Sequence, residues 1–286
     1  MMPTSLPRPT LFLSHGSPMM AIEPGEAGAF LRRLGQAMTE NWGQADAFVV
    51  VSPHTSTTRP VVLGATHHPT IHDFGGFPPA LYQVKYDTAG HPELARDIQA
   101  LLQPPQGPGC ARTDQGGLDH GIWTVLMHLH PSADVPVVPL SLTPRSSPAE
   151  LLALGRLLHE LPQRNIQIIG SGSLTHNLQR FFHEPEPVDA PEHPDCAQFR
   201  QWVQTQTASN QWDALLDYRR QAPHAHGMHP TDEHWLPFYL AAGAACRPEQ
   251  TYPLMSQRLF SGVTHGHLAM DAYGFASSRE ALEGLV

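Results

Sequence analysis

The chain has 286 residues, 41% of them hydrophobic, and a formal net charge of −9. This length allows one large domain or two small ones with a sizeable core, and the negative charge disfavours nucleic acid or an anionic membrane as the main partner. We find no signal-peptide pattern, no run near the ~18 apolar residues of a membrane span and no metal or disulfide pattern among the three cysteines. We therefore expect a cytoplasmic globular protein.

Two predicted strands near the N-terminus each end in a histidine. A short apolar run over 11–14 precedes His15 and a Gly-Ser-Pro turn, and after a predicted helix over 26–39 the β-branched run 47–52 precedes His54. Ligands bind beyond the carboxyl ends of strands in open α/β sheets, so the two imidazoles can meet. Neutral imidazole is a common metal ligand. The pattern predicts a mononuclear metal centre.

A loop rich in glycine and proline covers residues 67–79, after a possible short strand at 61–65. It carries His72, Phe74 and Phe77 around a Gly-Gly pair. Loops of this kind often present binding residues on a rigid scaffold. The structural alternative is an Ω-loop packed by its own aromatic rings, and we favour the binding role.

Strands and helices alternate through the middle of the chain. The predicted helices are 92–102, 122–130, 148–160, 194–208, 212–218 and 232–245, and the predicted strands are 135–142, 166–170 and one or two within 259–276. Asp119 and His120 stand at a predicted helix start, where backbone N–H groups point outward. The alternation predicts one α/β domain over 10–276, with a mostly parallel central sheet flanked by helices.

A Gly-Ser-Gly-Ser turn follows the strand 166–170 and leads into a predicted helix that bears His176 and Asn177. His176 is a candidate third ligand or a general base, because imidazole titrates near pH ~6.5. A helix-cap interaction is the structural alternative. A serine nucleophile at Ser171 or Ser173 is possible, but the GxSxG frame is missing.

Glu233 and His234 open the predicted helix 232–245, with Thr231 as its N-cap. Adjacent helical residues point about 100° apart, so both cannot easily face one ion. Two histidines and a carboxylate are the ligands of non-haem Fe(II) oxygenases, which nominates Glu233, whereas a third imidazole from His234 would suit zinc or iron. The residues leave this choice open. His229, in the preceding loop, is a weaker candidate for the substrate pocket.

Five segments that contain candidate histidines occur in this order along the chain: Leu11–Met19, Thr70–Pro78, Leu118–Gly121, Ser171–Asn177 and Pro230–His234. Together they resemble the class III extradiol ring-cleavage dioxygenases, most closely the DOPA-4,5-dioxygenase-like branch, over residues 10–275. The resemblance implies a single α/β domain with one Fe(II) or Zn(II) per chain. It also implies that His15, His54 and His234 are the metal ligands, which favours His234 over Glu233.

The resemblance further implies the roles of the remaining site residues. His176 would be a further ligand or the proton-transfer base, and His120 would assist near the substrate. A small aromatic diol would bind Fe(II) through both oxygens and react with O2, opening the ring beside the diol. His72, Phe74 and Phe77 would line its pocket. A homo-oligomer is possible.

One motif departs from the family pattern. Where Ser-Ala-His-Trp is usual, this chain reads Ser52, Pro53, His54 and Thr55. Loss of the tryptophan is expected to reshape the pocket wall beside His54.

Two other functions compete with the dioxygenase. The same ligands around Zn²⁺ would lower the pKa of bound water to about 7, as in a zinc hydrolase. A non-catalytic metal-binding or scaffold protein is the third possibility, and the intact set of four histidines argues against it.

Overall fold

The strands that form the centre of the molecule are its most apolar segments. In a computed structural model that describes residues 6–285, every residue of β1 (Thr10–Ser14), β7 (Val137–Leu142), β8 (Ile166–Gly172) and β12 (Ala272–Ala276) is buried. The other strands are β2 (Ala47–Ser56), β3 (Val61–Leu63), β4 (His67–His68), β5 (Thr88–Ala89), β6 (Ala111–Thr113), β9 (Met255–Phe260), β10 (Val263–Thr264) and β11 (Leu268–Ala269). Strands buried throughout are typical of a parallel sheet covered on both faces.

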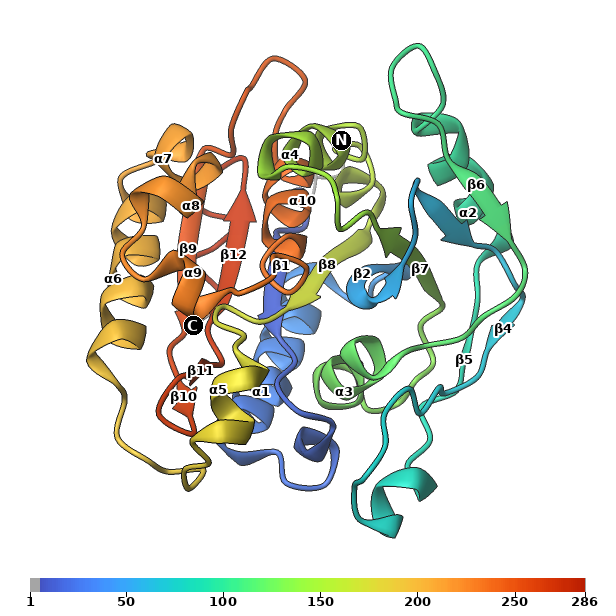
Figure 1. Cartoon of the computed structure of the whole chain (residues 1–286). Helices are drawn as coiled ribbons and strands as arrows, with labels where there is room; N and C mark the ends of the chain where they lie inside the picture. Colours follow the sequence, from blue (N-terminus) through green and yellow to red (C-terminus); the bar gives the residue numbers. More distant parts are fainter. Residues whose placement is uncertain (1–5, 286) are drawn as a thin grey trace.

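Eight of these strands form one sheet in the order β6-β3-β7-β2-β8-β1-β12-β9 (Figure 1). The pairs β1–β8, β8–β2, β2–β7 and β3–β6 are parallel, whereas β12 and β9 close one edge with antiparallel pairing and β3 pairs antiparallel with β7. The sheet is therefore mostly parallel, as predicted, and its central strands end at a common edge.

Helices cover both faces of this sheet (Figure 1). They are α1 (Gly25–Trp42), α2 (Pro92–Leu101), α3 (His120–Leu129), α4 (Pro148–Arg156), α5 (Leu178–His183), α6 (Pro194–Ala208), α7 (Trp212–Leu216), α8 (Tyr218–Gln221), α9 (Ala225–Met228) and α10 (Pro237–Ala244), with the short 3-10 helices η1 (Pro18–Ala21), η2 (Pro79–Gln83) and η3 (Pro162–Arg164). This arrangement confirms the predicted single α/β domain.

Strand residues alternate between the two hydrophobic cores, because side chains on a strand point to opposite faces. On β2, Val49 and Val51 pack with residues of α4 and α10, whereas Phe48 and Val50 pack with residues of α1 and α3. The β-branched run that predicted this strand thus supplies both cores. Among residues 6–285, none of the helices has the length and apolar content that a membrane crossing requires.

Three predictions of local structure were wrong, and a fourth, which concerns His176, is described with the site. The predicted helix over 232–245 begins only at Pro237, and a hydrogen-bonded turn from Asp232 precedes it, so Thr231 is not its N-cap. The predicted helix over 212–218 is divided between α7 and α8. The chain from Met255 to Ala276 forms four strands, two of them only two residues long, in place of one or two.

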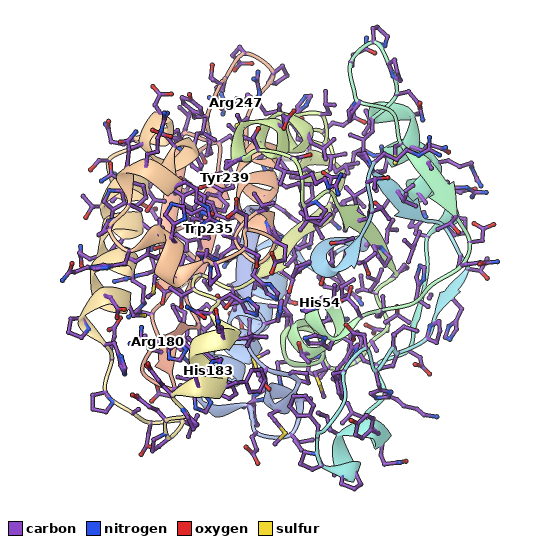
Figure 2. All side chains as sticks on the ribbon, in the orientation of Figure 1. His54, Arg180, His183, Trp235, Tyr239 and Arg247 are labelled. Carbon is purple, nitrogen blue, oxygen red and sulfur yellow. The ribbon has the colours of Figure 1, made fainter. Side chains whose placement is uncertain are left out.

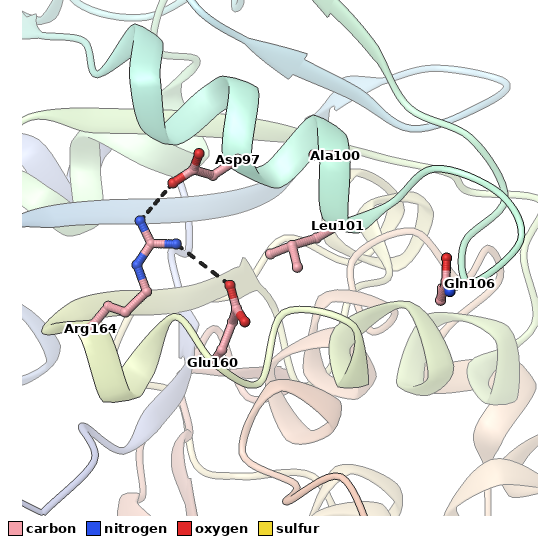
Figure 3. Close-up of a pocket in the computed structure, with 6 residues that line it drawn as sticks. All are labelled: Asp97, Ala100, Leu101, Gln106, Glu160 and Arg164. Atoms are coloured by element: carbon pink, nitrogen blue, oxygen red, sulfur yellow. Dashed lines mark hydrogen bonds and ion pairs between the residues drawn. The ribbon is translucent and has the colours of Figure 1, made fainter.

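A surface hollow between α2 and the chain before β8 lies away from the histidine motifs (Figure 3). Its one guanidinium, Arg164, is already paired with Asp97 at 2.6 Å and Glu160 at 3.5 Å. Arg164 precedes β8, at the amino ends of the parallel strands, whereas His15 follows the carboxyl end of β1. The hollow is therefore separate from the histidine site.

Candidate active site

Imidazoles from distant segments gather at the carboxyl edge of the sheet. They are His15 after β1, His54 in the irregular end of β2, His120 at the start of α3, His176 after β8 and His234 before α10. The ring centroids of His15, His54 and His234 lie 5.1 to 5.3 Å apart in all three pairs. His54 lies in the middle of the molecule, beside α3 (Figure 2). The two imidazoles at matching strand ends do meet.

The tautomer of His15 follows from a buried serine. Ser171 Oγ donates to the carbonyl oxygen of Gly121 and lies 3.0 Å from His15 Nδ1. A hydroxyl has one proton to donate, so this oxygen must accept from His15 Nδ1–H. His15 Nε2 therefore presents a lone pair to the cluster. Ser171, fully buried, serves this bond and is not an exposed nucleophile.

The nitrogen spacing fits a bound metal ion. His15 Nε2 and His54 Nε2 are 3.2 Å apart. Two imidazoles that bind one zinc ion at about 2.0–2.1 Å, with angles between about 90° and 110°, bring their nitrogens to about 2.8–3.4 Å. Without an ion, the same distance suits an N–H···N bond with the proton on His54 Nε2. A cation can take the place of that proton.

Asp73 is a site residue that the sequence reasoning missed. Its Oδ1 accepts from the backbone N–H of His120 at 2.9 Å, and its Oδ2 lies 3.0 Å from His120 Nδ1 and 3.8 Å from His54 Nδ1. Burial opposes ionisation, but hydrogen bonds from His120 lower the pKa of Asp73 below its usual range. The available signal was an acidic residue directly after His72 in a glycine-rich loop.

A second carboxylate, Asp119, holds the end of β2 against α3. Its side chain caps the helix at the Ile122 N–H and accepts from Ser52 Oγ at 2.7 Å and from Thr55 Oγ1 at 2.6 Å. Burial raises its pKa. Thr55 is the residue at which the family pattern has tryptophan, so in this chain that position anchors the segment that carries His54.

His176 does not lie on a helix, contrary to the prediction. It precedes α5, and Asn177 caps that helix by accepting from the Arg180 N–H at 2.9 Å. The His176 ring stacks on His234 with centroids 3.4 Å apart and planes 10° apart. The cap role that was the alternative for His176 thus belongs to Asn177.

Glu233 and His234 face the same region, because they belong to a turn and not to the expected helix. Their ligand atoms and that of His176 all lie within 4.8 Å of one another. Glu233 Oε1 is 3.2 Å from His234 Nδ1 and accepts from Thr231 Oγ1 at 3.0 Å. The carboxylate is thus placed to fix the proton of His234 at Nδ1.

Four imidazoles of the cluster, those of His15, His54, His176 and His234, are kept neutral near pH 7 by a lowered pKa. Burial, reinforced by neighbouring imidazoles, lowers the pKa of His15 and His234 well below 6.5 and that of His54 to about 3. Burial also lowers the pKa of His176 to about 4. Neutral imidazoles keep the lone pairs that a cation or a proton requires.

The aromatic loop lies against this cluster. Phe74 packs edge-on against Phe77, with centroids 5.2 Å apart, and against His120 at 5.8 Å. His72 Nε2 donates to the carbonyl oxygen of Val84 at 3.0 Å, which fastens the loop to the chain after η2. The loop therefore brings an apolar wall to the imidazoles.

His229 is fully buried, unlike the loop aromatics. Its Nε2 donates to the Leu174 carbonyl oxygen at 2.7 Å, and its ring lies 6.0 Å from that of Trp235. Burial lowers its pKa to about 3. The neighbouring Met228 carbonyl accepts from the His176 N–H at 2.8 Å, so His229 supports the segment behind His176.

Comparison with known proteins shows the family of the chain. The chain matches the family described as the catalytic LigB subunit of aromatic ring-opening dioxygenase over residues 9–266. Proteins named 4,5-DOPA dioxygenase extradiol from Beta vulgaris and Escherichia coli K12 are each 35% identical over 242 residues, which are 82% of this chain and 86% and 84% of theirs. A crystal structure of an uncharacterised Escherichia coli K12 protein has a TM-score of 0.70 and 25% identity, covering 93% of this chain and 99% of that one. The chain therefore belongs to the LigB family of extradiol aromatic ring-opening dioxygenases.

Proposed function

We propose that this chain opens a catechol-type ring with O2 at one metal ion, and that residues 10–276 form the catalytic unit. The family match over 9–266 and the span of the sheet from Thr10 to Ala276 support the boundaries. The observation that most directly supports a metal centre is the 3.2 Å separation of His15 Nε2 and His54 Nε2.

We assign His15, His54 and His234 as the ligands. Their rings form a nearly equilateral triangle, and the proton of His15 is held away from it at Nδ1. Glu233 accepts from His234 Nδ1–H, which leaves Nε2 of His234 free, as a carboxylate behind a metal-binding histidine does. When bound, Fe(II) would supply the redox chemistry between O2 and the diol, and Zn(II) is the other ion that such ligands suit.

We assign His176 as the proton acceptor and not a fourth ligand. Imidazole lone pairs lie in the ring plane, and the planes of His176 and His234 are only 10° apart. The two rings are stacked in nearly parallel planes, so an ion in the plane of one ring lies well out of the plane of the other and cannot bind both lone pairs. Burial keeps His176 neutral at pH 7, so its ring has a lone pair that can accept a phenolic proton.

We assign His120 as the second catalytic imidazole. Asp73 binds its Nδ1, which leaves Nε2 free to accept a proton from the substrate. Phe74 and Phe77 would pack against the substrate ring, His72 would hold their loop, and His229 would bound the pocket from the buried side.

Turnover of a diol panel tests the function. Protein loaded with Fe(II) under anaerobic conditions and then exposed to air is expected to consume one O2 per catechol and to form a ring-opened product with a new visible absorbance. Metal analysis is expected to give one ion per chain. The proposal would be overturned if metal-loaded protein consumed no O2 with any catechol of the panel. Aryl-ester turnover by the zinc form would favour the hydrolase.

Matched substitutions test the ligand assignment. His234→Ala is expected to lose the ion, whereas Glu233→Gln keeps an acceptor for His234 and is expected to retain it with weaker affinity. His67→Ala, at an exposed histidine, is the control and should bind metal like the unchanged chain. Retention of the ion by His234→Ala together with its loss from Glu233→Gln would reverse the assignment.

A further inference from the structure

Asp73 contacts His120 in two ways. One carboxylate oxygen accepts the His120 backbone N–H at 2.9 Å, and the other lies 3.0 Å from His120 Nδ1. The distance of 3.8 Å to His54 Nδ1 is too long for a hydrogen bond. Asp73 therefore acts mainly on His120.

These contacts determine the tautomer of His120. An ionised carboxylate only accepts hydrogen bonds, so it selects the form of the ring with a proton on Nδ1. The free Nε2 then carries the lone pair. The bond between the same carboxylate and the backbone N–H, at the first residue of α3, fixes the ring relative to the helix.

The same loop carries the substrate-facing aromatic rings. Asp73 lies between His72, which is bonded to Val84, and Phe74, which packs against His120. A loop displaced from this position would withdraw Phe74 from the pocket and the carboxylate from His120 together. Loop position and the protonation site of His120 are thus linked.

We propose that Asp73 is a positioning residue that holds His120 as the Nδ1–H tautomer and aims its Nε2 at the substrate. The role of Nε2 in turnover rests on the proposed function, whereas the tautomer itself does not.

Asp73→Asn tests the tautomer directly. The amide oxygen can keep the backbone bond, but its NH2 group then faces His120 Nδ1 and requires a lone pair there. ¹⁵N NMR of the metal-free protein is expected to show His120 protonated at Nδ1 in the unchanged chain and at Nε2 in the variant. The His120 signals are identified by their loss in His120→Gln.

Kinetics provide the second measurement. Asp73→Asn is expected to lower kcat about 10–100-fold, as loss of a supporting partner commonly does, with a much smaller change in KM for the catechol. Asp73→Glu keeps a carboxylate and is expected to keep the Nδ1–H tautomer. Asp134→Asn is the matched control, because Asp134 bonds His130 at the other end of α3 at 2.5 Å and is not in the site.

The outcomes separate this inference from the proposed function. An unchanged His120 tautomer in Asp73→Asn would overturn the inference, whether or not the protein opens catechols. If Asp73→Asn changes the His120 tautomer but the unchanged chain has no dioxygenase activity, the positioning role is supported and the proposed function is contradicted. Equal kcat losses in Asp73→Asn and Asp134→Asn would show a general structural effect and also overturn the inference.

Discussion

Substitution of Ser171 is expected to weaken metal binding although the residue is not a ligand. Ser171→Ala removes the hydroxyl that links His15 Nδ1 to the carbonyl oxygen of Gly121. His15 can then rotate or take its proton at Nε2, the atom that faces His54. Either change removes a lone pair from the place where an ion would bind.

The magnitude follows from the groups left without partners. Both the Nδ1–H of His15 and the Gly121 carbonyl lie in a buried region, and an unpaired buried polar group costs about 1–3 kcal/mol. Loss of a partner behind a metal-binding histidine typically reduces affinity about 10–100-fold, which corresponds to about 1.4–2.7 kcal/mol. We therefore expect the zinc dissociation constant to rise by that factor and the metal-free protein to become less stable.

Chelator competition with zinc measures the affinity, and urea unfolding of the metal-free protein measures the stability. Ser173→Ala is the matched control, because Ser173 is also buried and its Oγ donates to the Thr175 carbonyl oxygen at 2.9 Å, away from His15. Both variants should lose stability, but only Ser171→Ala should lose affinity. Equal zinc affinity in the two variants would refute the reasoning.

Three further outcomes are expected. Burial lowers the pKa of His229 to about 3, so below its unfolded value of about 6.5 the unfolded chain binds a proton that the folded chain does not. The free energy of unfolding of the metal-free protein in urea should therefore fall between about pH 7 and pH 5, and a rise would contradict this. Asp271 is buried between two guanidinium groups, so Asp271→Asn should lower the free energy of unfolding by about 3–5 kcal/mol. The side chain of Asp97 is exposed, and Asp97→Asn should lower it by at most about 1 kcal/mol. Equal losses in the two variants would contradict a stabilising role for the buried ion pair. Gly121→Ala would place Cβ 2.5 Å from Ser52 Oγ and should weaken zinc binding, whereas Gly227→Ala, with open space around it, should not; equal affinities would exclude the crowding.

The sheet and the proximity of His15 and His54 were predictable because continuous apolar runs specify buried strands. Each run was followed by a histidine, and the carboxyl ends of neighbouring parallel strands meet by topology. The position of His234 was less accessible. The turn that carries His234 could not be distinguished in the sequence from the first turn of a helix. Only Pro237, a residue that suits the first helical turn, indicates where α10 begins.

The supporting polar residues were not predictable for a different reason. Asp73 is 47 residues from His120, Ser171 is 156 from His15, and Ser52 is 67 from Asp119 in sequence. Hydrogen bonds over such separations depend on the packed fold and leave no periodic pattern in the chain. Strands of two residues, such as β4, are likewise defined by their partners and not by propensity.

These long-range bonds have a common end point in the first turn of α3. Ser52 binds the side chain of Asp119, Asp73 binds His120, and Ser171 binds the carbonyl of Gly121. The segments that carry His15 and His54 are therefore aligned against one short piece of helix, not each by its own strand alone. Glycine at 121 permits this, because any side chain there would collide with Ser52. A change that moves this turn should therefore disturb the candidate ligands and His120 together, whereas a change within a single strand should disturb only the histidine that it carries.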